Sequence, residues 1–81
     1  MTALLGPARM QDLQLEGVIQ LALENHAQVP FRRVHVLVCD RVATLTGNVD
    51  WRYQQNAAVA ATKAVAGVRE IVNRLTVTFT D

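Results

Sequence analysis

The chain has 81 residues, enough for one domain with a single modest hydrophobic core. Eight lysine and arginine residues against seven aspartate and glutamate residues leave a net charge of +1, which is too small to indicate nucleic-acid binding through a basic surface. Cys39 is the one cysteine, so an intrachain disulfide is excluded and a reducing compartment fits the composition.

The first residues show no sustained hydrophobic period. Residues 1–11 contain Gly6-Pro7, which predicts a flexible leader before a single domain at residues 12–81. The leader lacks the basic start and apolar run of a signal peptide, and no apolar stretch is long enough to span a bilayer. As written, the sequence predicts a cytoplasmic protein, or a periplasmic one if a signal peptide has been removed.

A first helix is expected over residues 12–26, where apolar residues recur on one face: Leu15, Ile19, Ala22 and Leu23. Asp12 is expected to cap its first amides, and Glu16 to lie in its first turn, where the helix dipole favours a carboxylate. Gly17 costs a helix about 1 kcal/mol relative to alanine. Either a close packing partner requires a residue without a side chain there, or the helix is locally weak.

Two strands are predicted over residues 34–39 and 43–49, where apolar and polar residues alternate. A tight turn at Asp40-Arg41 puts both apolar sets on one side, with the pairs Val38 and Ala43, Val36 and Leu45, and Val34 and Gly47. Arg41 argues against a two-residue primed turn, which requires positive φ and usually has glycine there. The sequence therefore predicts the register and leaves the turn type open.

Asp50 is expected to cap a second helix, which runs to about Ala66 and ends before Gly67. Its apolar stripe is predicted to contain Tyr53, Ala57, Ala60, Ala61, Ala64 and Val65. After Gly67, alternation predicts a third strand with the inward set Ile71, Asn73, Leu75, Val77 and Phe79.

These elements predict an α+β fold, an α-β-β-α-β sandwich in which a right-handed crossover leaves two helices packed on one face of a three-stranded mixed sheet. The other face is then uncovered, with His35, Leu37, Cys39, Thr44, Thr46, Val72, Arg74, Thr76 and Thr78. A sheet with one solvated face is ordinary. The alternative is a surface that binds another copy, a neighbouring domain or a lipid.

No group of side chains predicts catalysis. His35 lies too far along its strand from Cys39 to act as its base, and His26 adds no spacing typical of a zinc site. The carboxylates fall at turns, caps and strand ends, where no pair is fixed as acid and base. We therefore expect a protein that is not an enzyme and that needs no metal or other cofactor.

Two clusters place an aromatic residue next to arginine, at Phe31-Arg32-Arg33 and at Trp51-Arg52-Tyr53. This pairing suits the headgroup layer of a membrane, which makes Phe31, Arg32, Arg33, Trp51 and Arg52 candidate membrane contacts. The alternative is structural: Phe31 closes the core, Tyr53 belongs to the buried helix stripe, and the two arginines lie in a solvated loop.

The order of these features, from Asp12 to the end of the chain, resembles the BON domain, named for bacterial osmotically inducible and nodulation proteins. The most diagnostic residues are Gly47 and the pair Gly67-Val68, which the resemblance implies are fold-defining. The run from Val49 to Gln54 is similar to a subgroup found in tandem in cytoplasmic bacterial proteins. Arg41 and Ala43 depart from the family pattern, in which a glycine and a larger aliphatic residue are usual.

The resemblance implies a non-catalytic binding module that associates with phospholipid membranes or hydrophobic ligands, and no shared catalytic residues. The alternative is a protein-protein interaction or self-assembly module that acts through the uncovered sheet face, at His35, Leu37, Val72 and Arg74. Its partner would then be another copy of the chain or an adjacent BON or sensor domain. Nucleic-acid binding in the manner of a KH domain is disfavoured, because no Gly-x-x-Gly loop joins two helices.

Overall fold

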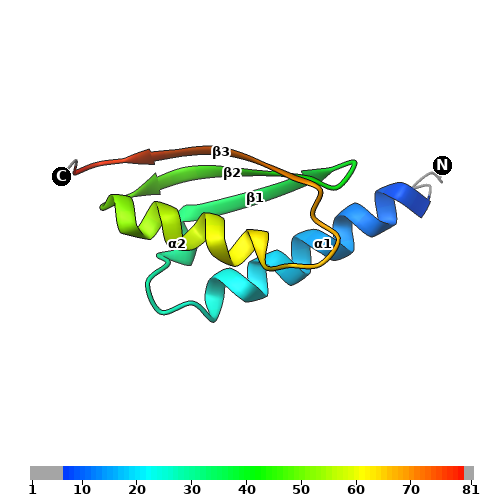
Figure 1. The fold of residues 1–81 in the computed structure, drawn as a ribbon, viewed down its shortest axis with the longest axis horizontal. Coiled ribbons are helices and arrows are strands. Elements are labelled where there is room, and N and C mark those ends of the chain that lie inside the picture. Colours follow the sequence, from blue (N-terminus) through cyan, green and yellow to red (C-terminus); the bar gives the residue numbers. More distant parts are fainter. Residues whose placement is uncertain (1–6, 80–81) are drawn as a thin grey trace.

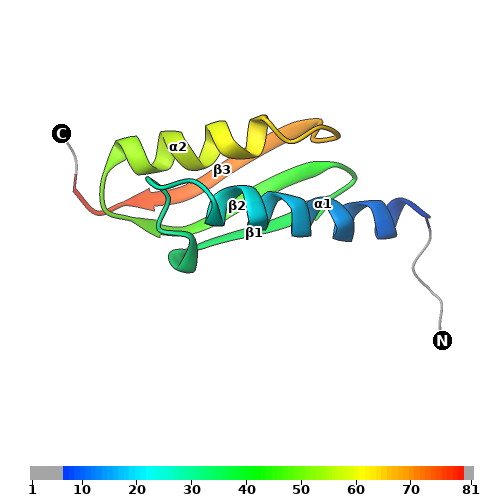
Figure 2. The same cartoon turned by 90° about the horizontal axis from the view of Figure 1, so that it is seen from below.

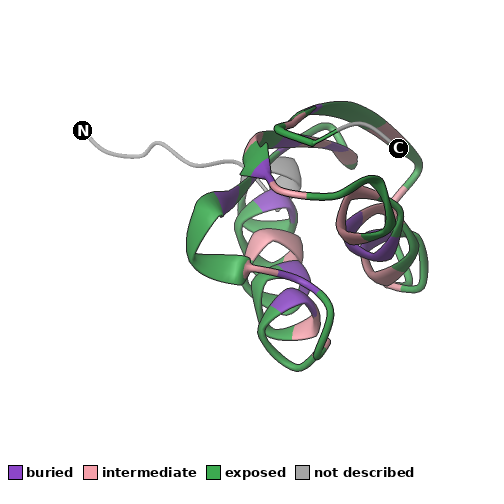
Figure 3. Ribbon diagram, turned by 90° about the vertical axis from the view of Figure 1, so that its left-hand side faces the viewer, coloured by how far each residue is buried: buried purple, intermediate pink, exposed green. Residues whose placement is uncertain are grey.

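The computed structural model describes residues 7–79, which follow the element order α-β-β-α-β. The elements are α1 (Pro7–Glu24), β1 (Val34–Cys39), β2 (Val42–Val49), α2 (Arg52–Lys63) and β3 (Glu70–Val77), and a short 3-10 helix, η1 (Phe31–Arg33), precedes β1. Both helices lie on one face of the sheet (Figures 1 and 3). In Figure 2, α1 runs alongside β1 and α2 alongside β3. The predicted fold class is confirmed.

β2 is the central strand of the sheet, antiparallel to β1 and parallel to β3. The hairpin has the predicted register, with the pairs Val38 and Ala43, Val36 and Leu45, and Val34 and Gly47. Asp40 and Arg41 both have positive φ, 52° and 62°, which is the backbone of a two-residue primed turn. Arg41 thus adopts a conformation that residues with a Cβ disfavour, so the turn requires support from elsewhere.

Helix α1 supplies that support. The Asp12 side chain is only 4% exposed, and its two carboxylate oxygens accept hydrogen bonds from the backbone amides of Asp40 at 2.8 Å and Arg41 at 3.0 Å. One helical turn further along, the Glu16 carboxylate accepts from the amide of Val38 at 3.0 Å. These two carboxylates hold the turn and satisfy part of the free edge of β1.

The start of α1 differs from the prediction. The helix begins at Pro7, so residues 7–11 of the expected leader are helical, while residues 1–6 lie outside the described part. Proline favours the first position of a helix, where its missing amide has no partner to lose. Asp12 is therefore not the N-cap, and Glu16 is not in the first turn; both lie inside the helix and face the hairpin.

The cap of α2 also differs from the prediction. The N-cap position is Trp51 and not Asp50, and the Gln54 side chain accepts from the amides of Asp50 at 2.9 Å and Trp51 at 3.0 Å. A glutamine in the first turn thus replaces the expected aspartate cap. The helix ends at Lys63, before the predicted Ala66.

The core fills the space between the helices and the inner face of the sheet. Its fully buried side chains include Ile19 and Leu23 from α1 and Val38, Leu45 and Val49 from the sheet. Helix α2 contributes small residues, Ala57, Ala58 and Thr62, and the Thr62 hydroxyl is satisfied by donating to the carbonyl of Ala58 at 2.8 Å. Short side chains let the helix approach the sheet closely.

The predicted apolar stripe of the second helix and the predicted inward set of the third strand were each wrong in part. Tyr53, Ala60 and Ala64 of the expected helix stripe are exposed, because α2 is rotated so that Ala58 and Thr62 are buried instead. On the third strand Leu75 is buried, whereas Asn73 and Phe79 are exposed. β3 is an edge strand, and Phe79 lies beyond its end.

The glycines differ in what surrounds them. Gly47 has a φ of 123°, and a Cβ there would overlap the carbonyl oxygen of Arg33. Gly67 has a φ of 100° and lies against Leu15, and Val68 beside it packs against the core. At Gly17 no atom lies within 4 Å of the position a Cβ would take. Of the two explanations for Gly17, a close packing partner within the described chain is therefore wrong.

Replacing Asp12 with alanine removes the acceptor of both turn amides and leaves Arg41 in an unfavourable conformation. We expect the free energy of unfolding to fall by about 2–4 kcal/mol in urea denaturation. Gln14→Ala, at an exposed position of the same helix, is the control and should change it by less than about 0.5 kcal/mol. Equal unfolding midpoints for the two variants would contradict this role of Asp12.

Gly47 and Gly17 provide a matched pair of alanine substitutions. Gly47→Ala should destabilise the fold by about 3 kcal/mol or more, because the methyl group meets backbone and the φ is strained. Gly17→Ala should stabilise the fold by up to about 1 kcal/mol, since only helix propensity changes there. Urea unfolding of both variants checks the difference, and a change of the same sign in both would refute it.

Candidate functional site

The predicted membrane-contact residues lie at the end of the molecule opposite the hairpin turn. There β1 begins while β2 and β3 end, as the pairs Val34 with Gly47 and Val49 with Val77 require (Figure 1). The guanidinium of Arg33 donates to the carboxylate of Asp50 at 3.1 Å, which ties η1 to the start of α2. We call this surface the aromatic end; its residues are Phe31, Arg32, Arg33, Trp51, Arg52 and Phe79.

Three exposed aromatic rings mark the aromatic end. The ring of Trp51 is 4.9 Å from that of Phe79 between centroids, tilted by 33°, and Trp51 remains 41% exposed. The guanidinium carbon of Arg32 lies 5.8 Å from the centre of the Phe31 ring, within cation–π range. Phe31 is exposed and does not close the core, so the structural explanation for it was wrong.

Sequence reasoning assigned Phe79 to the core and so missed it as a surface residue. Its amide donates to the carbonyl of Asp50 at 2.7 Å, and the amide of Thr78 donates to the carbonyl of Val49 at 2.8 Å. These bonds extend the β2 and β3 pairing past the strand ends and place Phe79 next to Trp51. The parallel register of β2 and β3 is the signal that could have found this contact.

The positive charge of the aromatic end is partly neutralised. The hydrogen bond from Arg33 to Asp50, and the charge of that carboxylate, raise the pKa of Arg33 above its usual value. Both side chains are exposed, so the ion pair contributes little to stability and is screened by salt. Arg32 and Arg52 form no ion pair with another residue of the described range 7–79. Two guanidinium groups therefore remain available to an anionic ligand.

The second surface is the sheet face opposite the helices, which Figure 3 shows as largely exposed. The register aligns three rows across the strands: Cys39, Val42 and Glu70; Leu37, Thr44 and Val72; and His35, Thr46 and Arg74. Leu37 is 59% exposed. We call the apolar part of these rows the sheet patch; it consists of Leu37, Cys39, Val42, Thr44 and Val72.

The rest of that face is polar and internally bonded. Asn48 donates to the Thr76 hydroxyl at 3.0 Å, and the Thr78 hydroxyl donates to the side-chain oxygen of Asn48 at 2.9 Å. The Thr76 hydroxyl also lies within hydrogen-bond distance of the Gly47 carbonyl, at 3.2 Å. This network occupies the polar groups near the aromatic end, so the sheet patch is confined to the half of the face near the hairpin turn.

The described residues contain neither a metal-binding cluster nor a membrane-spanning helix. Among residues 7–79, no cluster of three or more histidine, cysteine, aspartate or glutamate side chains could hold a metal ion. Neither described helix combines the length and apolar character that crossing a bilayer requires. Cys39 is a free, exposed thiol on the sheet patch.

Comparison with known proteins concerns the fold and not the residues of either surface. The model of the BON domain family matches residues 11–78. Among solved structures, CdsD of Chlamydia trachomatis, described as a structural protein of the type III secretion system, superposes with a TM-score of 0.70 at 21% sequence identity. The match covers 86% of this chain and 32% of that chain. Because the sequence identity is only 21%, the match shows the fold alone. No curated protein matches the chain.

Proposed function

Because the chain belongs to the BON domain family, we propose that it is a non-catalytic binding module that attaches to anionic phospholipid surfaces through its aromatic end. The family indicates a binding or interaction module. The observation that carries the choice of a lipid surface is that the exposed rings of Phe31, Trp51 and Phe79 share one end of the sheet with two arginines. These are Arg32 and Arg52, whose guanidinium groups form no ion pair within residues 7–79.

The physical chemistry of the aromatic end fits an interfacial contact. Aromatic rings concentrate at the headgroup level of a bilayer, and each basic residue near an anionic surface contributes about 1 kcal/mol. Arg32 and Arg52 together supply about 2 kcal/mol on this scale, which gives weak attachment for a single domain. Several linked or assembled copies would bind far more tightly, because the second contact becomes intramolecular.

Trp51 fluorescence tests this proposal directly, since it is the only tryptophan and lies at the proposed contact. The chain is titrated with vesicles of phosphatidylglycerol and phosphatidylcholine, and with phosphatidylcholine alone, at low and high salt. We expect a blue shift that is limited to the anionic vesicles and lost at high salt. No shift and no co-sedimentation with anionic vesicles would overturn the proposal.

The Arg33–Asp50 ion pair makes a sharper prediction. Asp50→Asn frees Arg33 for the membrane and should strengthen binding to anionic vesicles about fivefold, whereas Arg32→Gln should weaken it by about the same factor. Arg74→Gln, on the uncovered sheet face, is the charge-matched control and should leave the affinity unchanged. An equal loss for Arg32→Gln and Arg74→Gln would indicate attraction by net charge alone.

The sheet patch supports a second candidate function, self-assembly. Leu37 and Val72 are exposed on the two edge strands, with Thr44 of the central strand between them in one row. A contiguous exposed apolar surface is typical of interaction sites. The same fold would then associate through sheet faces, whereas lipid attachment uses the aromatic end.

Analytical ultracentrifugation distinguishes assembly from lipid binding. If the sheet patch is the interface, Leu37→Asp should convert an oligomer to a monomer, since a buried unpaired carboxylate is strongly unfavourable. Leu21→Asp is the matched control, because Leu21 on α1 is also 59% exposed but lies on another surface. A wild-type chain that sediments as a monomer at all concentrations would exclude self-assembly.

A further inference from the structure

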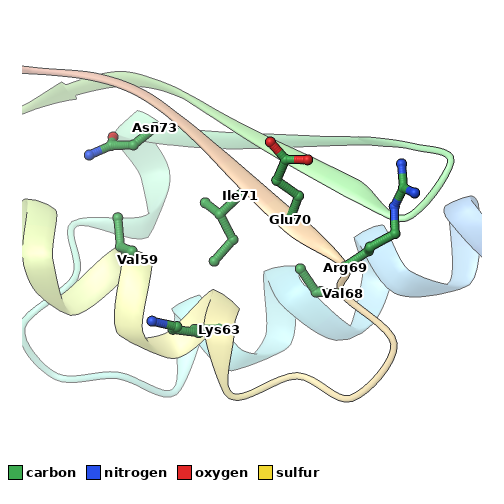
Figure 4. Close-up of a pocket in the computed structure, with 7 residues that line it drawn as sticks. All are labelled: Val59, Lys63, Val68, Arg69, Glu70, Ile71 and Asn73. Atoms are coloured by element: carbon green, nitrogen blue, oxygen red, sulfur yellow. The ribbon is translucent and has the colours of Figure 1, made fainter.

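A groove of about 400 Å³ separates α2 from the first half of β3 (Figure 4). Its lining residues are Val59, Lys63, Val68, Arg69, Glu70, Ile71 and Asn73. Figure 4 shows Val59, Val68 and Ile71 pointing into the space between helix and strand, whereas Glu70 points away from it. The volume lies within the range of ligand pockets, and the floor is apolar.

One wall of the groove is the outer edge of β3. Alternate residues of an edge strand direct both backbone groups away from the sheet. Leu75 is one of these outward-pointing residues, because its backbone bonds to side chains and not to β2. Its amide donates to the Asn73 side chain at 3.1 Å, and its carbonyl accepts from Gln55 at 3.1 Å. By the two-residue period of a strand, the backbone groups of Ile71 and Asn73 also point outward, toward the groove.

The two edges of the sheet are closed to different extents. On β1, the Glu16 carboxylate accepts from the outward amide of Val38. On β3, the Gln55 and Asn73 side chains close the edge at Leu75. Within residues 7–79, no comparable side-chain bond closes the edge at Ile71. An unpaired strand edge beside an apolar groove is the arrangement that accepts an added strand.

The charge of the groove indicates which side chains an added peptide strand should carry. The ammonium group of Lys63 forms no ion pair with another residue in the described part of the chain. Arg69 is paired with Asp40 at 3.5 Å, outside the groove and beside the hairpin turn. Lys63 is therefore the cation available to a bound group, and its complement is a carboxylate.

We propose that this groove binds an extended peptide that adds to β3 as a fourth strand, with an apolar side chain between Val59 and Ile71 and a carboxylate beside Lys63. β3 begins at Glu70, and the Gln55 and Asn73 side chains close its edge at Leu75. Pairing with the added strand therefore extends over about three residues. The site is separate from the aromatic end and from the sheet patch, so its failure leaves the proposed function unaffected.

The probe is a blocked pentapeptide, acetyl-Thr-Val-Thr-Asp-Thr-amide, which presents valine and aspartate on the same side of a strand. Titration of the isotope-labelled chain, followed by NMR, should shift the amides of Ile71 and Asn73 and slow their hydrogen exchange. The same peptide with lysine in place of aspartate should bind more weakly, by roughly two- to fivefold. Of two singly N-methylated peptides, one modified at valine and the other at the threonine that follows it, only one should lose binding, because adjacent amides of a strand point to opposite edges.

Variants of the chain separate backbone pairing from charge. Ile71→Pro removes one outward amide at an edge position where proline is tolerated and should abolish binding, whereas Ile71→Val keeps the amide and should preserve it. Lys63→Glu should reverse the preference between the aspartate and lysine peptides, and Arg69→Gln should not. Retained binding by both N-methylated peptides, shifts confined to the aromatic end or sheet patch, or no shifts at millimolar peptide would each overturn the proposal.

Discussion

The carboxylate of Asp12 is the contact on which the rest of the sheet depends. It accepts both amides of a turn whose second residue, Arg41, has an unfavourable positive φ. That turn sets the register of β1 against β2, and a slip of one residue would move every side chain to the opposite face. Asp12 therefore stabilises the turn that holds the apolar sets of β1 and β2 on the core side of the sheet.

Each helix contacts one edge of the three-stranded sheet, but the two edges are not satisfied to the same extent. Helix α1 lies along β1 and supplies Glu16 to its edge, in addition to holding the turn. Helix α2 lies along β3 but satisfies its edge only near Leu75, through Gln55. The remainder of that edge faces the groove, where α2 presents Val59 and Lys63. The buried alanines Ala57 and Ala58 lie elsewhere on the same helix and let it approach the sheet.

Ion pairs neutralise some of the cations among residues 7–79 and leave others, the guanidinium group of Arg41 in the hairpin turn included, without a carboxylate partner. The two ion pairs found among residues 7–79 lie at opposite ends of the sheet, Arg33 with Asp50 and Arg69 with Asp40. Each joins segments distant in sequence and removes an arginine from the free charge of its surface. Arg32, Arg52 and Lys63 remain outside these pairs, at the aromatic end and in the groove. A net charge of +1 conceals this separation.

The alternation of apolar residues determined the strands, the hairpin register and the two-helix arrangement, because these depend on periods of 2.0 and 3.6 residues that are visible along the chain. Only the tertiary structure decided the partners of isolated polar groups. Asp12 and Asp50 both look like helix caps in the sequence, yet one holds the hairpin turn and the other pairs with Arg33. The rotation of α2 and the pairing of Phe79 with Trp51 were likewise decided by packing across elements, which local patterns do not encode.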